Sequence, residues 1–396
     1  MNKYDICVVG GGGHVGLPLS IAFAAKGKRV IISDTNKGAL KTIGEGVMPF
    51  TENGADKILK RVIHKKLFLT DRLDVVKDSE YIIVVIGTPV DEHLNPTYKQ
   101  IMAFFEEMKP FLRKGQAVIL RSTVYPGITK KIQELLKESN ICFCPERIAE
   151  GKAMEELFTL PQIISGFNPA AVRKVGKLFS LLTKDILYLD PLEAELAKLF
   201  TNSWRYVQFA VANQFYMIAA EYGADFYAIY NAMTHNYPRA KNFPKPGFTA
   251  GPCLFKDTMQ ISAFTNHKFF LGHSAMLINE GLPNFIMDQL KKSYRLSEMV
   301  VGILGMAFKA ESDDSRESLS YKLRKLAYLE AKLVLCSDAY IKDESFVDEK
   351  ILIDKSDVII IGAPHQRYKK LNFKGKILVD IWNHAAPQKT RNKKRP

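Results

Sequence analysis

A glycine-rich turn between an apolar strand and a helix is the feature that most constrains how this chain folds. The strand Ile6 to Val9 is followed by a G-x-G-x-x-G pattern with Gly11, Gly13 and Gly16, and Asp34 closes the next strand. In a dinucleotide-binding fold the glycines allow a tight turn, the approach of a pyrophosphate and close packing of helix on strand. The alternative is an incidental glycine-rich turn, which would require neither the acid nor the flanking strand and helix.

Asp34 also indicates which dinucleotide binds. Its carboxylate can accept hydrogen bonds from both hydroxyls of the adenosine ribose and would repel a 2′-phosphate, so the sequence predicts NAD in preference to NADP. The residues of this segment that we expect to contact NAD are Gly11, Gly13, His14, Val15, Gly16 and Asp34.

Strand-length apolar segments alternate with helical ones over residues 4–160. Alternation of this kind is typical of a parallel, doubly wound sheet. The expected strands after the first are Arg29 to Ser33, Tyr81 to Ile86, Ala117 to Ser122 and Ile141 to Cys144, and the first helix is expected from about Val15 to Lys26.

A long helical periodicity of apolar residues runs from Leu192 to about Tyr222. It predicts a helix of roughly 30 residues, which could bridge two lobes or build a subunit interface. A loop rich in Pro and Gly follows from Tyr237 to Pro252, and then mostly helical sequence to about Leu290. Strand patterns return at Val300 to Leu304, Leu333 to Cys336, Val358 to Ile361 and Ile377 to Val379, which predicts a second, smaller α/β unit.

The formal charge of +14 would suit nucleic acid, a membrane surface or a multiply anionic small substrate, and charge alone does not choose among them. Lys and Arg are dispersed, without the aromatic interleaving of proteins that bind single strands. The longest apolar runs are too short to span a bilayer. With no signal-peptide pattern at the N-terminus, the sequence predicts a cytoplasmic protein.

The five cysteines do not indicate a disulfide framework, because their number is odd. Cys142 and Cys144 alternate along an expected strand, so core packing explains them. They have no companion Cys or His cluster at ligand spacing, and the sequence predicts no metal site.

Cys253 has a different setting, at the end of the loop and at an expected helix start. A thiol near a helix N-terminus and a lysine, here Lys256, has a lowered pKa and more thiolate. Asp257, one helical turn on, could act as a base toward a group bound at the thiol. A lone loop cysteine is more often inert, so the sequence alone leaves that alternative open.

Further polar candidates lie on the long helix and at strand ends. Lys198 and Asn202 are at positions i and i+4 of the helix and share a face, which either points to solvent or lines a site. The segment from Cys144 to Gly151 carries Glu146 and Glu150, and it follows a strand at the edge where ligands bind in such sheets. The segment from Arg121 to Gly127 ends another strand at the same edge.

Taken together, these motifs resemble the UDP-glucose/UDP-N-acetylmannosamine dehydrogenase family over essentially the whole chain. The matching segments are the glycine-rich turn, Gly87-Thr88-Pro89, Ser122-Thr123-Val124, Pro145-Glu146-Arg147, Lys198 with Asn202, the Cys253 loop with Lys256-Asp257, and Gly305-Met306-Ala307-Phe308-Lys309 with Asp313-Asp314-Ser315-Arg316-Glu317. The resemblance implies a Rossmann-like NAD domain over residues 1–190, a central helical dimerisation domain over 191–295, and a Rossmann-like domain over 296–396 that binds the UDP-sugar.

The resemblance also implies a four-electron oxidation of the sugar's C6 hydroxyl to a carboxylate, with two NAD consumed and with a thiohemiacetal and a thioester on Cys253. Oxyanion stabilisation falls to Lys198 and Asn202, and the proton and water steps to Asp257, Thr123 and Glu150. The NAD contacts it adds are Thr88, Thr123 and Arg316. The implied substrate contacts are Glu146, Arg147, Lys198, Asn202, Arg239, Gly251 and Lys309.

Three positions depart from the common family pattern. Ala250 stands where many members have glycine, and Ser337-Asp338-Ala339 stands where an Asp-Pro is usual. Arg147 replaces the Phe typical of UDP-glucose enzymes and resembles members that act on N-acetylhexosamines, which favours a sugar of the UDP-N-acetylmannosamine type.

Four alternatives remain beside this interpretation. They are a UDP-glucose 6-dehydrogenase, a β-hydroxyacid dehydrogenase that makes a single hydride transfer, a non-catalytic NAD or nucleotide-sugar binder, and a nucleic-acid-binding protein. The resemblance implies a homodimer with neither nucleic acid nor membrane as partner, and a product used in surface polysaccharide or glycoconjugate precursors.

Overall fold

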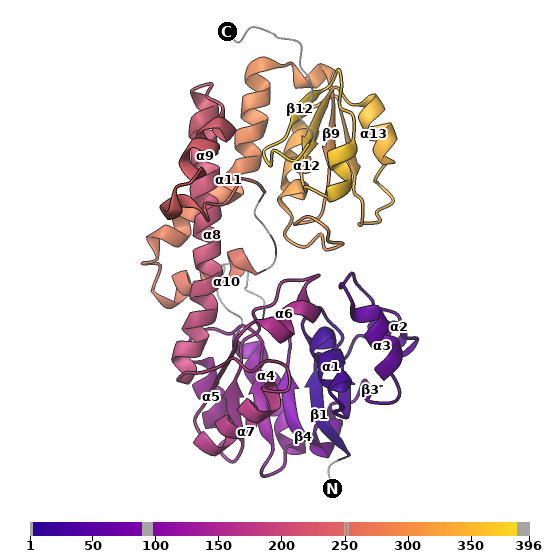
Figure 1. The fold of residues 1–396 in the computed structure, drawn as a ribbon, viewed down its shortest axis with the longest axis vertical. Coiled ribbons are helices and arrows are strands. Elements are labelled where there is room, and N and C mark those ends of the chain that lie inside the picture. The colour runs from indigo at the N-terminus through magenta and orange to yellow at the C-terminus, as the bar shows by residue number, and fades with distance from the viewer. Residues whose placement is uncertain (1–2, 89–97, 249–250, 252, 386–396) are drawn as a thin grey trace. The chain divides into compact units, whose positions relative to one another are not determined.

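The chain divides into two units in this computed structural model, which describes residues 3–88, 98–248, 251 and 253–385. Residues Met1–Thr201 with Met259–His267 make up the N-terminal unit, and Asn202–Thr258 with Lys268–Pro396 make up the C-terminal unit. Figure 1 traces both, from indigo at the N-terminus to yellow at the C-terminus.

The N-terminal unit is built on a sheet whose strand order in the described chain is β3-β2-β1-β4-β5-β6-β7-β8. Strands β1 to β6 are parallel, and Ile6 lies opposite Val30 on one side and Tyr81 on the other. This order is that of a doubly wound dinucleotide fold, so the predicted α/β class is confirmed. The strands are β1 (Tyr4–Val9), β2 (Val30–Ser33), β3 (Leu67–Thr70), β4 (Ser79–Val84), β5 (Ala117–Leu120), β6 (Asn140–Phe143), β7 (Gln162–Gly166) and β8 (Ile186–Tyr188).

Strands β7 and β8 depart from the expected all-parallel sheet, because β7 pairs with β6 in the antiparallel direction. The reason lies in the connection from β6 to β7. Its only described helix, α6 (Ala153–Thr159), has 7 residues and is therefore about 10 Å long, which is too short to return the chain to the other edge of the sheet. The chain re-enters at the carboxyl edge and β7 runs back.

Helices cover both faces of this sheet. Core residues from α1, α3, α6 and α7 gather on one face, and residues from α4, α5 and the start of α8 gather on the other. The expected first helix is confirmed as α1. The helices are α1 (Gly16–Ala25), α2 (Lys37–Gly44), α3 (Ala55–Val62), α4 (Tyr98–Met108), α5 (Ile128–Leu135) and α7 (Pro169–Phe179), with 3-10 turns at Leu73–Asp78 and Lys109–Phe111.

The expected long helix is present as α8 (Pro191–Glu221), which has 31 residues. Its first turns pack within the N-terminal unit, where the buried carboxylate of Glu195 accepts hydrogen bonds from the backbone N–H groups of Gly127 and Thr129 at 2.6 and 2.8 Å. These amides begin α5, so a residue not singled out in the sequence fixes the start of α8.

The rest of α8 belongs to the C-terminal unit, together with α9 (Phe226–Thr234) and α11 (Phe270–Ser293). Helix α10 (Leu254–Phe264) follows the loop that ends at Cys253, and a 3-10 turn spans Pro238–Ala240. No helix among the described residues is long and apolar enough to cross a lipid bilayer.

A second, smaller parallel sheet completes the C-terminal unit, with the order β10-β9-β11-β12. Helices α11 and α12 cover one face of this sheet and α13 the other. All four strands expected here are confirmed. The elements are β9 (Val300–Leu304), α12 (Leu319–Glu330), β10 (Leu333–Ser337), α13 (Glu349–Lys355), β11 (Val358–Ile361) and β12 (Ile377–Val379), with 3-10 turns at Leu296–Glu298 and Gln366–Lys370.

Candidate active site

The glycine turn after β1 has the steric pattern of a dinucleotide cradle. A Cβ on Gly16 would lie 2.5 Å from the Cα of Gly11, and a Cβ on Gly11 would lie 2.9 Å from the carbonyl oxygen of Val8. A Cβ on Gly13 would meet no atom within 4 Å, so the space above this residue is open. The two outer glycines permit close packing, and the open one leaves room for a pyrophosphate at the start of α1.

Asp34 follows β2 and lies against this turn. Its Oδ2 accepts the backbone N–H of Gly12 at 2.8 Å, and its Oδ1 accepts that of Asn36 at 2.9 Å. Val15 precedes the first helical residue, and the ring of His14 stacks on Phe50 with centroids 4.0 Å apart. The turn, the acid and the helix start therefore fit NAD, and all of these contacts lie within the N-terminal unit.

Thr88 and Thr123, which were predicted to contact the cofactor, follow β4 and β5 and lie close together. The Thr88 hydroxyl donates to the carbonyl oxygen of Thr123 at 2.6 Å, and the Ser122 hydroxyl donates to that of Ile86 at 2.7 Å. These bonds tie the segment after β4 to the segment after β5 at the carboxyl edge of the sheet. Pro89 of the same motif lies outside the described residues.

An ion pair not foreseen from the sequence holds the segment after β6. Arg121, fully buried at the end of β5, donates to Oε2 of Glu146 from Nε at 2.8 Å and from a terminal nitrogen, and its second terminal nitrogen donates to the carbonyl oxygen of Cys144. The other oxygen of Glu146 accepts the backbone N–H of Arg147 at 2.7 Å. The available signal was a charged residue directly after four apolar strand residues.

Arg147 itself is half-buried and donates to the carbonyl oxygen of Pro161. Burial lowers the pKa of its guanidinium, and neighbouring Glu146 opposes that shift. Glu150 lies at the end of the same loop and is partly buried.

The predicted nucleophile and its neighbours converge in the C-terminal unit. Cys253 is exposed immediately before the first residue of α10. Its carbonyl oxygen accepts the N–H of Asp257 at 3.0 Å. The Asp257 carboxylate is buried, with Oδ1 3.2 Å from the ammonium of Lys256 and Oδ2 accepting from the side-chain amide of Asn202 at 2.6 Å.

The sequence left open whether Lys198 and Asn202 point to solvent or line a site. Their exposed fractions are 9% and 5%, so neither faces solvent on α8. Cys142 and Cys144 are buried as predicted, and burial raises the pKa of the Cys142 thiol to about 12.

The loop before Cys253 is held by residues that sequence reasoning missed. The N–H of Gly247 donates to the side-chain oxygen of Asn213 at 2.8 Å, and Asn213 in turn donates to Asn279 at 2.9 Å. A Cβ on Gly247 would lie 2.0 Å from the ring of Trp382, so any larger residue here would force the indole to shift. These contacts join α8, α11 and the segment after β12.

Gly251 has the backbone conformation that favours glycine, with φ at +106°, and a Cβ there would lie 2.6 Å from the ring of Phe308. It therefore packs against the segment after β9. The predicted departure at Ala250 lies outside the described residues.

The segment after β9 carries the remaining candidates. The Arg316 side chain, about half exposed, donates from Nε and a terminal nitrogen to Asp314, the latter at 2.6 Å. The ammonium of Lys309 lies 5.5 Å from the ring centroid of Phe308. Arg239 is exposed and donates to the Tyr237 hydroxyl at 2.9 Å, at the margin of a cavity of about 500 Å³ that also involves Trp204.

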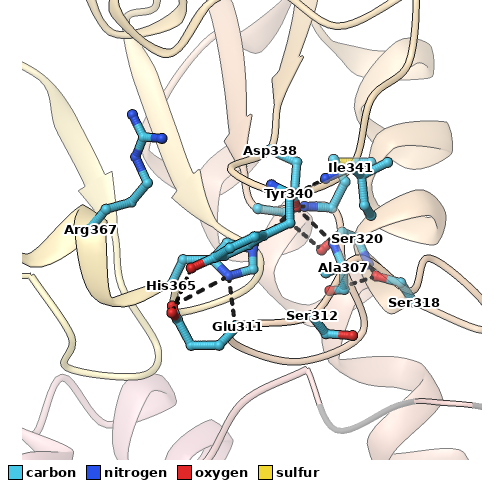
Figure 2. A network of polar contacts seen from close by, with 12 residues as sticks. Ala307, Glu311, Ser312, Ser318, Ser320, Asp338, Tyr340, Ile341, His365 and Arg367 are labelled. Carbon is cyan, nitrogen blue, oxygen red and sulfur yellow. Dashed lines mark hydrogen bonds and ion pairs between the residues drawn. The ribbon is translucent and has the colours of Figure 1, made fainter. Parts of the chain in front are cut away.

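A buried network fills the carboxyl edge of the second sheet (Figure 2). Oδ2 of Asp338 accepts the N–H groups of Met306 and Ala307 at 2.6 and 3.0 Å and lies 3.2 Å from Nε2 of His365. Nδ1 of His365 accepts the N–H of Glu311 at 2.9 Å, so Nε2 carries the proton toward Asp338. Burial by itself would raise the pKa of Asp338, but hydrogen bonds from His365 and from backbone amides outweigh it and lower this pKa to about 2.

Comparison with known proteins identifies three successive domains of one family in this chain. Residues 4–183, 192–280 and 302–387 match, in order, the NAD binding, central and UDP binding domains of the UDP-glucose/GDP-mannose dehydrogenase family. The UDP-N-acetyl-D-mannosamine dehydrogenase of Pyrococcus horikoshii is 31% identical over 393 residues, with 93% of each chain covered.

Solved structures agree. The structure of a UDP-D-ManNAc dehydrogenase from Pyrococcus horikoshii has a TM-score of 0.86 at 29% identity, covering 93% of this chain and 91% of that one. A UDP-glucose dehydrogenase from Pyrobaculum islandicum has a TM-score of 0.87 at 23% identity, covering 95% and 94%, and this likeness concerns the fold alone. The chain belongs to the UDP-glucose/GDP-mannose dehydrogenase family of NAD-dependent oxidoreductases.

Proposed function

We propose that this enzyme oxidises the C6 hydroxyl of a UDP-linked N-acetylhexosamine to the carboxylate, with Cys253 as covalent nucleophile. The preferred substrate in this proposal is UDP-N-acetylmannosamine. The observation that carries the proposal is the buried pair Asn202 and Asp257, held with Lys256 one helical turn from an exposed thiol at a helix start. The choice of sugar is supported by the similarity to UDP-N-acetyl-D-mannosamine dehydrogenases. It is also supported by Arg147, which stands where UDP-glucose enzymes typically have Phe.

NAD binds the turn after β1. When bound, it accepts a hydride in each of the two oxidation steps. We assign Gly11, Gly13, His14, Val15 and Gly16 to the pyrophosphate turn and Asp34 to the ribose. Thr88, Thr123 and Arg316 complete the proposed cofactor contacts.

The thiol divides the reaction into steps. Cys253 adds to the aldehyde formed at C6 and gives a thiohemiacetal, which the second oxidation converts to a thioester. Water then cleaves the thioester, which releases the carboxylate and restores the thiol. For one sugar the balance is one alcohol, two NAD and one water in, and one carboxylate, two NADH and three protons out.

We assign the remaining catalytic roles to residues of both units. The charge of Lys198 and the second amide hydrogen of Asn202 stabilise the oxyanion that thiolate attack creates. Asp257, already fixed by Asn202 and Lys256, takes up protons near the thiol. Thr123 and Glu150 complete the proton and water steps, with Glu150 positioning the hydrolytic water.

The substrate contacts remain a proposal by family resemblance. They comprise Arg147, Lys198, Asn202, Arg239, Gly251, Lys309 and Glu146. For Glu146 we favour an indirect part, because one of its carboxylate oxygens accepts from Arg121 and the other from Arg147 and Ile148.

A second copy of the chain is the proposed partner of α8. Trp204, Val211, Phe215, Ile218 and Tyr222 recur at helical spacing, and their side chains are between 38% and 85% exposed. An apolar stripe of this size suits a homodimer interface. We further propose domain boundaries at 190 and 295, a cytoplasmic location, a product used in polysaccharide precursors, and no nucleic-acid or membrane partner.

The test is NADH formation by the purified enzyme with UDP-N-acetylmannosamine, UDP-N-acetylglucosamine and UDP-glucose, counted per sugar consumed and repeated with Cys253→Ala. Two NADH per sugar with an N-acetylhexosamine donor, lost in the variant, is the expected result. Two NADH with UDP-glucose only would favour the alternative substrate. No NADH with any donor despite NAD binding would favour a binding protein.

A further inference from the structure

Carboxylates accept four backbone N–H groups of the loop that carries Glu150, those of residues 147, 148, 149 and 151. Oε1 of Glu146 accepts the N–H groups of Arg147 and Ile148 at 2.7 and 3.1 Å, and Glu156 accepts that of Ala149 at 2.5 Å. These two acids belong to the loop itself and to the helix α6 that follows it. They shape the loop locally but do not attach its far end to the rest of the N-terminal unit.

Glu52 provides that attachment from a distant part of the sequence. Its Oε2 accepts the N–H of Gly151 at 2.9 Å, and its Oε1 accepts that of Met154 in the first turn of α6 at 3.3 Å. The carboxylate is buried, with 4% of Glu52 exposed. Asn53 adds a third bond, from its side-chain amide to the carbonyl oxygen of Gly151 at 2.9 Å.

The segment bearing Glu52 is itself anchored beside the cofactor turn. Phe50, two residues before Glu52, stacks on His14 with ring centroids 4.0 Å apart. At the opposite end of the Glu150 loop, the buried pair of Arg121 and Glu146 holds the chain to β5. Glu150 is thus carried on a loop fixed at both ends.

We propose that Glu52 is a positioning residue for the hydrolysis step, because it fixes the backbone of the loop that carries Glu150, the residue assigned above to the hydrolytic water. This inference rests on the proposed function, since it needs an acyl-enzyme on Cys253. Charge at Glu52 matters as well as shape: both of its oxygens accept from amides, whereas glutamine would present an NH₂ group to one of those donors. The displaced loop would then shift the carboxylate of Glu150 and the water assigned to it.

The test separates hydrolysis from oxidation in Glu52→Gln. Rapid mixing with NAD and a donor that gives two NADH in the wild type measures the first NADH release, and intact-protein mass spectrometry after acid quench measures the sugar thioester on Cys253. We expect thioester breakdown to slow by between about tenfold and a hundredfold, because an ångström-scale misplacement has effects of this size. The first NADH release should stay within about twofold of the wild type, so the acylated protein should accumulate.

Glu45→Gln is the matched control, because Glu45 is an exposed glutamate of the same region. Asn53→Ala is the second variant; Asn53 is exposed, so this change tests the same attachment even if Glu52→Gln fails to fold. We expect it to slow thioester breakdown in the same direction, by a few-fold.

Two outcomes overturn the inference while leaving the proposed function intact. One is equal slowing of NADH release and thioester breakdown without accumulation of the adduct, which would make Glu52 a purely structural residue. The other is thioester breakdown in Glu52→Gln and in Asn53→Ala at the rate measured for Glu45→Gln. Failure of the wild type to form any NADH or adduct would instead refute the proposed function, and this inference with it.

Discussion

The side-chain amide of Asn202 donates to Oδ2 of Asp257 across 2.6 Å, and both residues are buried. The second oxygen of Asp257 lies 3.2 Å from the ammonium of Lys256. One amide and one cation therefore hold the carboxylate in a single orientation, a helical turn after Cys253. A group fixed in this way can exchange protons with a substrate without first having to reorient.

Replacing Asp257 tests this assignment. Asp257→Asn keeps the shape and an acceptor for Asn202 but removes the base, so kcat should fall by about 10²-fold, within the range measured for general bases. The measurement is the steady-state rate of NADH formation at saturating donor and NAD. Asp288→Asn, at an exposed aspartate of α11, is the control. Equal rates in the two variants would remove Asp257 from the chemistry.

Asp34 should determine the choice of dinucleotide. Asp34→Asn removes the negative charge beside the turn and weakens the acceptor for the ribose hydroxyls, so KM for NAD should rise by about tenfold. The ratio of kcat/KM for NADP to that for NAD should rise as well, because repulsion of the 2′-phosphate is lost. Asp71→Asn, at an exposed acid, serves for comparison, and an unchanged cofactor ratio in Asp34→Asn would contradict the assignment.

A double-mutant cycle tests the contact between Gly247 and Trp382. Gly247→Ala should lower the free energy of unfolding by about 1–3 kcal/mol, because its Cβ would overlap the indole ring. With Trp382→Leu in place the same change should cost at least about 1 kcal/mol less. Both values come from denaturant unfolding. Gly281→Ala, where a Cβ meets open space, should not destabilise, and additive costs at 247 and 382 would show that the ring is not the obstacle.

Acid should expose the contribution of Asp338. Its folded-state pKa of about 2 lies below the ordinary value near 4, so the ionised carboxylate stabilises the fold. This stability is complete above about pH 4 and is lost as the pH falls through 2. The gap in Tm between wild type and Asp338→Asn should therefore be wide at pH 6 and narrow at pH 3. A gap independent of pH would mean that the charge contributes nothing.

Much of the fold follows from local patterns in the sequence. Apolar strand residues, the glycine turn with Asp34 and the long periodicity from Leu192 predicted most of the strands and α8, because each signal lies within one element. The direction of β7 did not follow, since it depends on how far the seven-residue α6 can carry the chain. Strands β3 and β8 were not predicted either, and length alone does not explain this, because β12 also has 3 residues and was recognised.

In the candidate site, too, patterns within one element could be read from the sequence, whereas contacts between distant residues could not. The spacing of Cys253 and Asp257 within one helical turn was readable, and so was that of Lys198 and Asn202. The attachments that hold them were not: Glu52 meets Gly151 from 99 positions away, and Asn202 meets Asp257 from 55. Contacts at such separations are set by tertiary packing, and no periodicity in one sequence encodes them.

The indole of Trp382 against Gly247 has a consequence for the order in which the protein matures. Translation produces the thiol loop long before the tryptophan that packs against it. Until the ribosome has translated Trp382, the loop before Cys253 lacks the indole ring that packs against Gly247. A nascent chain can thus contain the NAD turn and Cys253 while the loop before Cys253 is not yet packed, so products truncated before Trp382 should bind the cofactor but be inactive.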